Sequence, residues 1–150
     1  IGIILFVFGV GVANPFSVFG SGAAYQAEEP GILRLTRHPA LFGLAFWGAG
    51  HTLANGSFAL MLFFLVQTAF ALLGAVSMDR RHKKAMGEQT WSLMTEKTSF
   101  WPNPLTIIRR VDNPVRVSVR WLLSLALIAG LIALHPVLFG VYPLALATSG

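Results

Sequence analysis

The sequence FALMLFFLVQTAFALLGAVS, residues 58–77, decides the fold class of this chain. It carries no charged residue. A helix rises about 1.5 Å per residue, so about 20 residues cross a hydrocarbon core of about 30 Å. The preceding Asn55-Gly56-Ser57 is a turn signal, and residues 40–54 before it are also apolar, with Pro39 placed for a first helical turn. The sequence therefore predicts a tight helical hairpin within a membrane.

Two further apolar stretches flank this hairpin. One covers residues 1–13 and the other residues 117–134, and an apolar tail at 137–147 follows His135-Pro136. Since apolar runs of this kind repeat along the whole chain, we expect an all-α fold. We expect this fold to be a polytopic transmembrane helical bundle that forms a single domain over residues 1–150.

Composition excludes several classes of protein. The 150 residues are 55% hydrophobic and 11% charged and include no cysteine, whereas soluble domains are about 25% charged. These values exclude a disordered chain, a disulfide-stapled secreted domain, an ordinary cytosolic enzyme and any thiolate metal site. The chain begins inside an apolar run without methionine or the charged start of a signal peptide, so we expect its natural N-terminal segment to be missing.

The basic residues indicate the orientation in the membrane. Arg34 and Arg37 precede the apolar residues 40–54, and the others follow the apolar residues 58–77. These others are Arg80, Arg81, Lys83, Lys84, Lys97, Arg109, Arg110, Arg116 and Arg120. By the positive-inside rule, the basic segments are cytoplasmic and the Asn55 turn faces outward. The net charge of +5 then reflects orientation and contact with the lipid bilayer, and we expect no nucleic-acid partner.

Residues 79–101 are too polar to span a membrane. Met86, Trp91, Leu93 and Met94 give this stretch an apolar side. We expect an amphipathic interfacial helix on the cytoplasmic surface, with its basic face toward anionic lipid. Pro102 and Pro104 are expected to end this helix.

His51 is the histidine whose position most suggests a ligand. It lies about one turn before the end of the helix expected over 40–54, and ionisable groups within spans face a partner or a cavity. Neutral imidazole is an axial ligand of haem iron. Gly48 lies one turn below on the same face and leaves room either for a flat macrocycle or for a neighbouring helix. The residues therefore leave a haem ligand and an interhelical hydrogen bond as alternatives.

The other histidines occupy different depths. His38 and His51 are thirteen residues apart, about 20 Å along a straight helix, so they cannot bracket one iron. His135 is expected at the depth of His51, where it either shares an iron with His51 or simply ends the last span before Pro136. His82 lies among basic residues and is expected to be solvated.

A cationic cluster of Arg34, Arg37 and His38 is expected at the cytoplasmic mouth of the bundle. It either binds an anion or a cofactor phosphate, or anchors the chain and caps helix ends. Asp79, next to Arg80, lies at the same membrane face and is placed to pair with this cluster. Hydrolase and nucleotide-binding functions have no support, because no Gly-x-Ser-x-Gly or glycine-rich phosphate loop is present.

The chain resembles the NnrU family of bacterial membrane proteins, which is named from denitrification gene clusters. The resemblance lies in GILRLTRHP at 31–39, in Gly43 and Trp47, and in HTLANG at 51–56. Further matching positions are Asn14-Pro15, Asp79-Arg80-Arg81, Gly87-Glu88, Trp91, Thr98-Ser99, His135-Pro136, 139–141 and Pro143. The resemblance implies a multi-pass protein of the bacterial inner membrane with cytoplasmic basic loops.

The related plant and cyanobacterial branch is 15-cis-zeta-carotene isomerase, a haem b enzyme that isomerises a polyene double bond. The resemblance implies that His51 is a ligand of haem b iron and that the substrate is a hydrophobic small molecule. It also implies that a second histidine lies upstream of this chain. A cysteine that can replace the ligand in that branch corresponds to Gly48 here. The other cofactor-binding candidates are His135, Arg34, Arg37 and His38.

Two alternative functions remain open at this stage. Arg37-His38-Pro39 with Gly43 resembles the Arg-His-Pro-x-x-x-Gly motif of isoprenylcysteine and phospholipid methyltransferases, and Glu88 resembles part of their second motif. Leu41-Phe42 replaces the tyrosine of that motif. This resemblance implies an S-adenosylmethionine-dependent membrane methyltransferase. The other alternative is a non-catalytic accessory subunit of a respiratory nitrogen-oxide complex.

Overall fold

The all-α prediction is confirmed. A computed structural model describes residues 1–21, 25–109 and 114–143, with no side chains described for 107–109. Apart from one isolated bridge between Ala13 and Ser21, the regular structure in these ranges is helical. The helices are α1 (Gly2–Gly9), η1 (Gly31–Arg34), α2 (Pro39–Ala54), α3 (Phe58–Met86), α4 (Glu88–Thr95), η2 (Pro104–Arg109) and α5 (Pro114–Phe139).

Two of these helices are long and apolar enough to cross a membrane. They are α3, with 29 residues, and α5, with 26 residues. Large apolar side chains such as Phe63, Phe70 and Leu122 project from them into the surroundings with more than half of their surface exposed. An apolar surface of this extent suits hydrocarbon and not water. The chain is a membrane protein.

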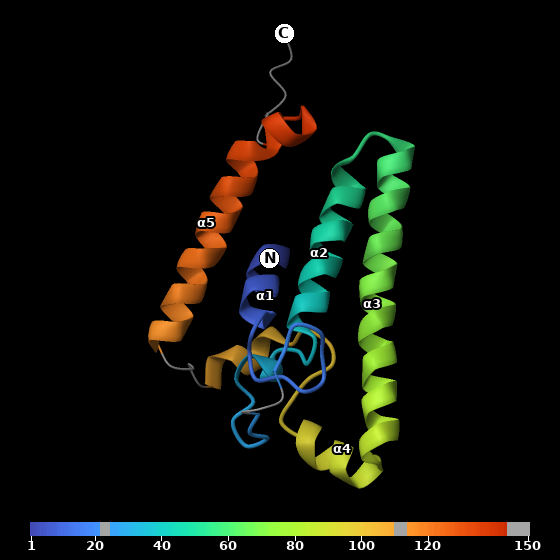
Figure 1. Ribbon diagram of the computed structural model, residues 1–150, viewed down its shortest axis with the longest axis vertical. Coiled ribbons are helices and arrows are strands. Elements are labelled where there is room, and N and C mark those ends of the chain that lie inside the picture. Colours follow the sequence, from blue (N-terminus) through green and yellow to red (C-terminus); the bar gives the residue numbers. More distant parts are fainter. Residues whose placement is uncertain (22–24, 110–113, 144–150) are drawn as a thin grey trace.

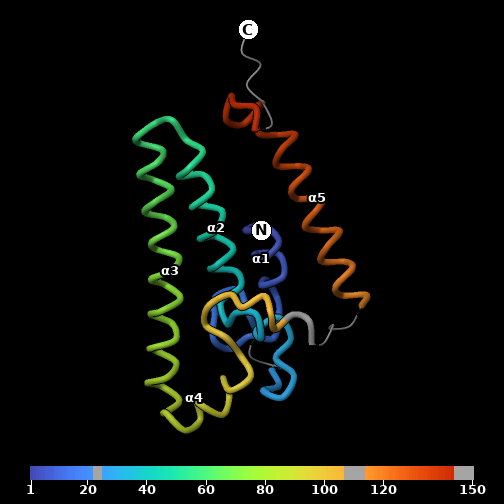
Figure 2. The backbone as a smooth tube through the Cα atoms, turned by 180° about the vertical axis from the view of Figure 1, so that it is seen from behind, coloured from blue at the N-terminus to red at the C-terminus, as the bar shows by residue number. Residues whose placement is uncertain are grey.

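The helices stand side by side, and the connecting segments gather at one end. Figures 1 and 2 show α2 and α3 as an antiparallel hairpin, with α1 between α2 and α5. The α2–α3 turn and the C-terminal end of α5 lie at the end opposite α4 (Figure 1). We call these the outer and inner ends of the molecule. At the inner end Phe16 and Leu33 are fully buried beside Trp91, which α4 supplies.

Glycines allow α1 and α2 to pack with their backbones in contact. A Cβ atom on Gly43 would lie 2.6 Å from the backbone nitrogen of Phe6 and 2.7 Å from the carbonyl oxygen of Gly2. A Cβ atom on Gly9 would lie 2.5 Å from the backbone nitrogen of Ala40. Small residues drive close helix approach in membranes because they let dispersion contacts form along the backbone.

The helical hairpin lies where the sequence predicts it, but α3 ends later than the sequence predicts. Pro39 opens α2 in its first turn, and the chain turns at residues 55–57. The helix α3 continues beyond residue 77 to Met86, so Asp79 and the basic residues after it belong to α3 and not to a separate surface helix. Arginine and lysine are good helix formers and lie favourably at a helix C-terminus. The helix ends only at Gly87, whose φ of 82° suits glycine.

Three other boundaries also differ from the prediction. The polar surface helix is reduced to α4, which ends before Pro102. The helix α5 runs through Pro136 to Phe139, although the proline has no amide N–H to donate to the carbonyl four residues earlier. The predicted apolar tail at 137–147 therefore begins as helix, and its residues from 144 lie outside the described ranges.

Candidate functional site at the two ends of α2

At the inner end of α2, one carboxylate accepts hydrogen bonds from two side chains. Asp79 of α3 accepts hydrogen bonds from Arg37, 3.1 Å from Nε and 2.6 Å from Nη2 to Oδ2. Its other oxygen, Oδ1, lies 2.7 Å from Nε2 of His38. The predicted pairing of Asp79 with the cationic cluster is therefore confirmed for Arg37 and His38.

The backbone around His38 is fixed by three segments that are distant in the sequence. Nδ2 of Asn14 donates to the carbonyl of Arg37 at 2.8 Å. The Thr36 hydroxyl donates to the carbonyl of Phe100 at 2.7 Å, and the Arg37 amide donates to the carbonyl of Ser99 at 2.7 Å. The entry to α2 is thus tied to the segments before η1 and after α4, and Asp79 adds the end of α3.

His38 donates to Asp79 from Nε2, because a carboxylate only accepts. His38 is fully buried, and its Nδ1 has no partner among the described residues. Arg37 also donates to the Thr98 hydroxyl at 3.1 Å and lies over the ring of Trp91, 5.4 Å from its centroid.

Arg34, the third member of the predicted cluster, does not contact Asp79. Its Nη2 donates to the carbonyl of Glu28 at 3.2 Å. The structure therefore brings together Arg37 and His38 but does not add Arg34 to them. Sequence reasoning missed Asn14, Thr98 and Trp91 as parts of this network, although each belongs to a block that carries the family resemblance.

At the outer end of α2, His51 is held by its own helix. Its Nδ1 lies 2.9 Å from the carbonyl oxygen of Trp47. Because a carbonyl only accepts, Nδ1 donates this hydrogen bond, and Nε2 is the ring nitrogen left for another partner. The imidazole packs against two aromatic rings, with centroids 4.5 Å from Trp47 and 4.8 Å from Phe64 of α3, and these two rings also pack against each other at 5.3 Å.

The space at Gly48 is filled by the neighbouring helix. A Cβ atom there would lie 2.0 Å from Oε1 of Gln67 and 2.5 Å from the Thr68 hydroxyl. Nε2 of Gln67 donates across the helices to the carbonyl of Leu44 at 3.3 Å. The interhelical hydrogen bond therefore comes from Gln67 and not from His51. This face of α2 packs against α3 and does not face open space for a macrocycle.

The remaining histidines are also held locally. At the end of α5, Nδ1 of His135 donates to the carbonyl of Val141 at 2.8 Å, and its ring packs 4.9 Å from that of Phe139. The ends of α2 and α5 lie at the same end of the molecule (Figure 1). His51 and His135 nevertheless contact different residues there. His82 bonds in the same way to Met78. Within the described ranges, no three His, Asp or Glu side chains gather as a metal cluster.

His51 fits the chemistry of a haem axial ligand. Donation from Nδ1 to the carbonyl of Trp47 fixes the tautomer and the ring orientation, which leaves Nε2 available as the donor atom. The two flanking rings are apolar surfaces of the kind that line haem pockets. A macrocycle bound to His51 would lie away from the Gly48 face, where Gln67 and Thr68 already pack.

Comparisons with known proteins place this arrangement in context. The sequence model of a family described as NnrU protein matches residues 1–143. The chain is similar to 15-cis-zeta-carotene isomerase of Arabidopsis thaliana, with 39% identity over 74 residues, which are 49% of this chain and 20% of the relative. With the Zea mays isomerase, it is 34% identical over 86 residues, 57% of this chain and 23% of the relative. The chain thus covers less than a quarter of each relative. No solved structure matches it.

Proposed function

This chain belongs to the NnrU family, and on that basis we propose that it is a haem b-binding membrane protein that isomerises a double bond of an apolar polyene. We further propose that it is a multi-pass protein of the bacterial inner membrane. Its basic segments would then be cytoplasmic and its α2–α3 turn would face outward.

The observation that carries this proposal is the hydrogen bonding of His51. Its Nδ1 is bonded to the carbonyl of Trp47 near the outer end of a helix in a membrane protein, and its Nε2 has no hydrogen-bond partner among the described residues. The relatives are named as isomerases of 15-cis-zeta-carotene, a long apolar polyene. A membrane-embedded site lined by aromatic rings suits a substrate that is dissolved in lipid.

In this proposal the residues around His51 bind and orient, while the cofactor supplies the reactive centre. When bound, haem would supply a Lewis-acidic or one-electron centre. Nε2 of His51 would hold the iron, and the carbonyl of Trp47 would keep the imidazole in the required tautomer. The rings of Trp47 and Phe64 cover part of the imidazole.

The absorption spectrum tests the cofactor assignment. We expect the protein, expressed with any native upstream segment and purified in detergent with haem supplied, to show a Soret band and a pyridine-haemochrome signature. His51→Ala should lose most of this absorption, whereas His82→Ala, its matched control, should keep it. A folded wild-type protein without the band contradicts haem binding, and an unchanged spectrum in His51→Ala contradicts the ligand assignment.

The isomerase assignment needs its own assay. Haem-loaded protein in liposomes should convert 15-cis-zeta-carotene into an isomer with a different retention time in chromatography, and protein without haem should not. Conversion at the spontaneous rate by a haem-loaded preparation contradicts this activity. The alternative to isomerase activity is a role in nitrogen-oxide metabolism, which the denitrification gene clusters in the family's name suggest. Addition of nitric oxide to the same preparation tests this alternative, because ligation to the iron would shift the Soret band, and an unchanged band would contradict it.

The methyltransferase alternative remains a separate prediction. Arg37 and His38 are engaged by Asp79, so the motif that suggested it is already satisfied within the protein. Calorimetry with S-adenosylmethionine tests this alternative, and no heat of binding at millimolar ligand would contradict it. Co-purification of a partner above background from detergent extracts tests the accessory-subunit alternative.

A further inference from the structure

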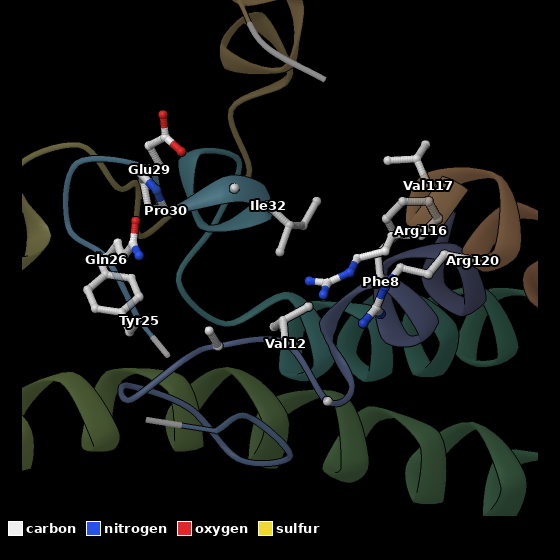
Figure 3. Close-up of a pocket in the computed structure, with 13 residues that line it drawn as sticks. Phe8, Val12, Tyr25, Gln26, Glu29, Pro30, Ile32, Arg116, Val117 and Arg120 are labelled. Atoms are coloured by element: carbon white, nitrogen blue, oxygen red, sulfur yellow. The ribbon is translucent and has the colours of Figure 1, made fainter. Parts of the chain in front are cut away.

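A buried amide oxygen without a hydrogen-bond partner lies between α2 and α3. It is Oε1 of Gln67, for which no donor is found among the described residues. The cavity of about 310 Å³ at the inner end differs from this place, because its charged lining residues Arg116, Arg120 and Glu29 already interact within the protein (Figure 3). The cavity therefore offers none of these charges to a ligand, whereas the hairpin holds a polar atom whose position needs a reason.

The amide of Gln67 is unusual in its surroundings. It is the one amide side chain within the apolar residues 58–77. A polar group inside a membrane-spanning helix costs free energy, and such groups face a partner or have a function. Nε2 of Gln67 has a partner, since it donates to the carbonyl of Leu44 in α2 at 3.3 Å. Oε1 has none, and buried oxygens of this kind are rare enough to call for an explanation.

The oxygen lies where a glycine of α2 leaves room for it. A Cβ atom on Gly48 would lie 2.0 Å from Oε1 of Gln67, so only a glycine hydrogen fits there. Cα–H groups are weak donors to oxygen at helix–helix contacts. The amide therefore reaches two places on α2 that are one turn apart, the carbonyl of Leu44 and the Cα of Gly48. A side chain held in this way opposes both sliding and rotation of α2 on α3.

The next contact along the same pair of helices belongs to His51. It lies three residues after Gly48, and Phe64 lies three residues before Gln67. Because α2 and α3 are antiparallel (Figure 1), both steps lead toward the outer end, by about 4.5 Å along each helix. The ring of Phe64 packs 4.8 Å from the imidazole of His51. A movement of α2 at Gly48 would therefore carry the imidazole across the ring of Phe64.

We propose that Gln67 is a positioning residue for His51. By holding α2 at Leu44 and Gly48, its amide sets the direction of Nε2 of His51 and the extent to which Phe64 covers the imidazole. The consequence for a cofactor rests on the haem binding proposed above. The placement of His51 itself does not, so it can be measured in the protein without haem.

Thr68 supplies a matched control beside Gln67. Its hydroxyl donates to the carbonyl of Phe64 in its own helix at 2.8 Å and lies 3.5 Å from the carbonyl of Ala45 in α2. The longer distance makes the contact between the helices weak. Thr68→Val removes the hydroxyl and keeps the shape of the side chain, whereas Gln67→Met removes the amide and keeps its length.

Nuclear magnetic resonance of protein labelled with ¹⁵N in histidine, in detergent without haem, tests the placement. The ring signals of His51 are identified by their loss in His51→Ala. Gln67→Met should shift these signals and leave those of His38 in place, whereas Thr68→Val should leave both close to wild type. Unchanged His51 signals in Gln67→Met would overturn the proposal. Equal shifts of His38 and His51 would also overturn it, because they would indicate a general loosening of the fold.

A haem titration measures the consequence for the cofactor. We expect Gln67→Met to bind haem about tenfold more weakly than the wild type, with a shifted midpoint potential, and Thr68→Val to stay close to the wild type. A wild-type affinity and potential in Gln67→Met would contradict the positioning role. A wild type that binds no haem would contradict the function proposed above, and the resonance comparison would then still decide the role of Gln67.

A double variant separates positioning from the filling of space. Gly48→Ala meets the amide of Gln67 and the hydroxyl of Thr68, so it should lower the melting temperature. Adding Gln67→Ala removes the amide from that space, so the double variant should regain part of the melting temperature. It should not regain the wild-type signals of His51, because the amide is absent. Recovery of both would show that Gln67 only fills space and would overturn the proposal.

Discussion

The helix α2 carries a histidine near each end, and the protein treats the two in opposite ways. At the inner end His38 is fully buried, and its Nε2 donates to Asp79 of another helix. At the outer end His51 is partly exposed, and its Nδ1 donates to the carbonyl of Trp47 one turn below. The ring nitrogen that donates within the protein differs between the two histidines, and this difference decides the role of each. His38 joins helices together, whereas His51 leaves its Nε2 available for a ligand.

The largest effect that this comparison predicts is a loss of stability when the carboxylate of Asp79, at the inner end, is removed. Asp79→Ala leaves Arg37 and His38 without their shared acceptor in a largely buried place. Breaking a buried ion pair by removing one partner costs about 3–5 kcal/mol. We expect a strongly lowered melting temperature in detergent, measured by intrinsic fluorescence, and poor recovery of the protein.

Two variants show whether the buried ion pairs of Asp79 are responsible for this loss of stability. Asp79→Asn keeps the shape but removes the charge, so it should lose part of the same stability. Arg80→Gln changes an exposed neighbour and should leave the melting temperature close to that of the wild type. A wild-type melting temperature in Asp79→Ala would show that the inner network does not stabilise the fold.

The second effect concerns the packing of α2 against α1, between the two ends of α2. A methyl group on Gly43 would meet backbone atoms of α1, which cannot move aside as a side chain can. Gly43→Ala should therefore push α1 and α2 apart and destabilise the protein by about 1–3 kcal/mol. Gly50→Ala in the same helix meets nothing within 4 Å and should be neutral or slightly stabilising. Equal melting temperatures for the two variants would contradict this packing.

Hydropathy and turn chemistry predicted the hairpin but not the true end of α3. The charged residues after residue 77 end the apolar run, and this pattern predicts a separate surface helix there. Hydropathy, however, reports the surroundings of a helix and not its hydrogen bonding. Charged side chains with good helix propensity continued the helix until Gly87 supplied a positive φ. The same limit applies at Pro136, which lies inside α5 and not beyond its end.

The inner network was only partly predictable. Asp79 was expected to meet Arg37 and His38 because all three lie on the polar side of apolar stretches, and membrane depth brings them together. Asn14 and Thr98 join through irregular segments, and their partners depend on a tertiary path that periodicity does not encode. At the other end, Gln67 could have been found from the sequence, because a lone amide within an apolar span needs a partner.

The third prediction sharpens the contrast between the two histidines. His51→Ala loses one hydrogen bond within α2 and its contacts with the rings of Trp47 and Phe64, so it should cost about 1 kcal/mol or less. His38→Ala removes the short hydrogen bond to Oδ1 of Asp79, which then keeps only the 3.4 Å contact with Nε of Arg37, and should cost about 1–3 kcal/mol. Melting temperatures of the two variants, measured without haem, give the comparison. A larger loss for His51→Ala would reverse the roles assigned here.

The smallest effect is expected from an ion pair that is also at the inner end but lies in solvent. Lys97 donates to Glu28, and this hydrogen bond lowers the pKa of the fully exposed Glu28 carboxyl. A carboxyl with a lowered pKa in the folded state stabilises the fold above its unfolded pKa, and the contribution is lost as the pH falls through the folded pKa. Solvent screening makes exposed pairs weak, so Glu28→Gln should match the wild-type melting temperature within error at neutral pH and below it. A drop as large as that of Gly43→Ala would show that charge pairing stabilises this end without burial. An unchanged value, beside a large loss in Asp79→Ala, would show that burial makes the His38 network structural.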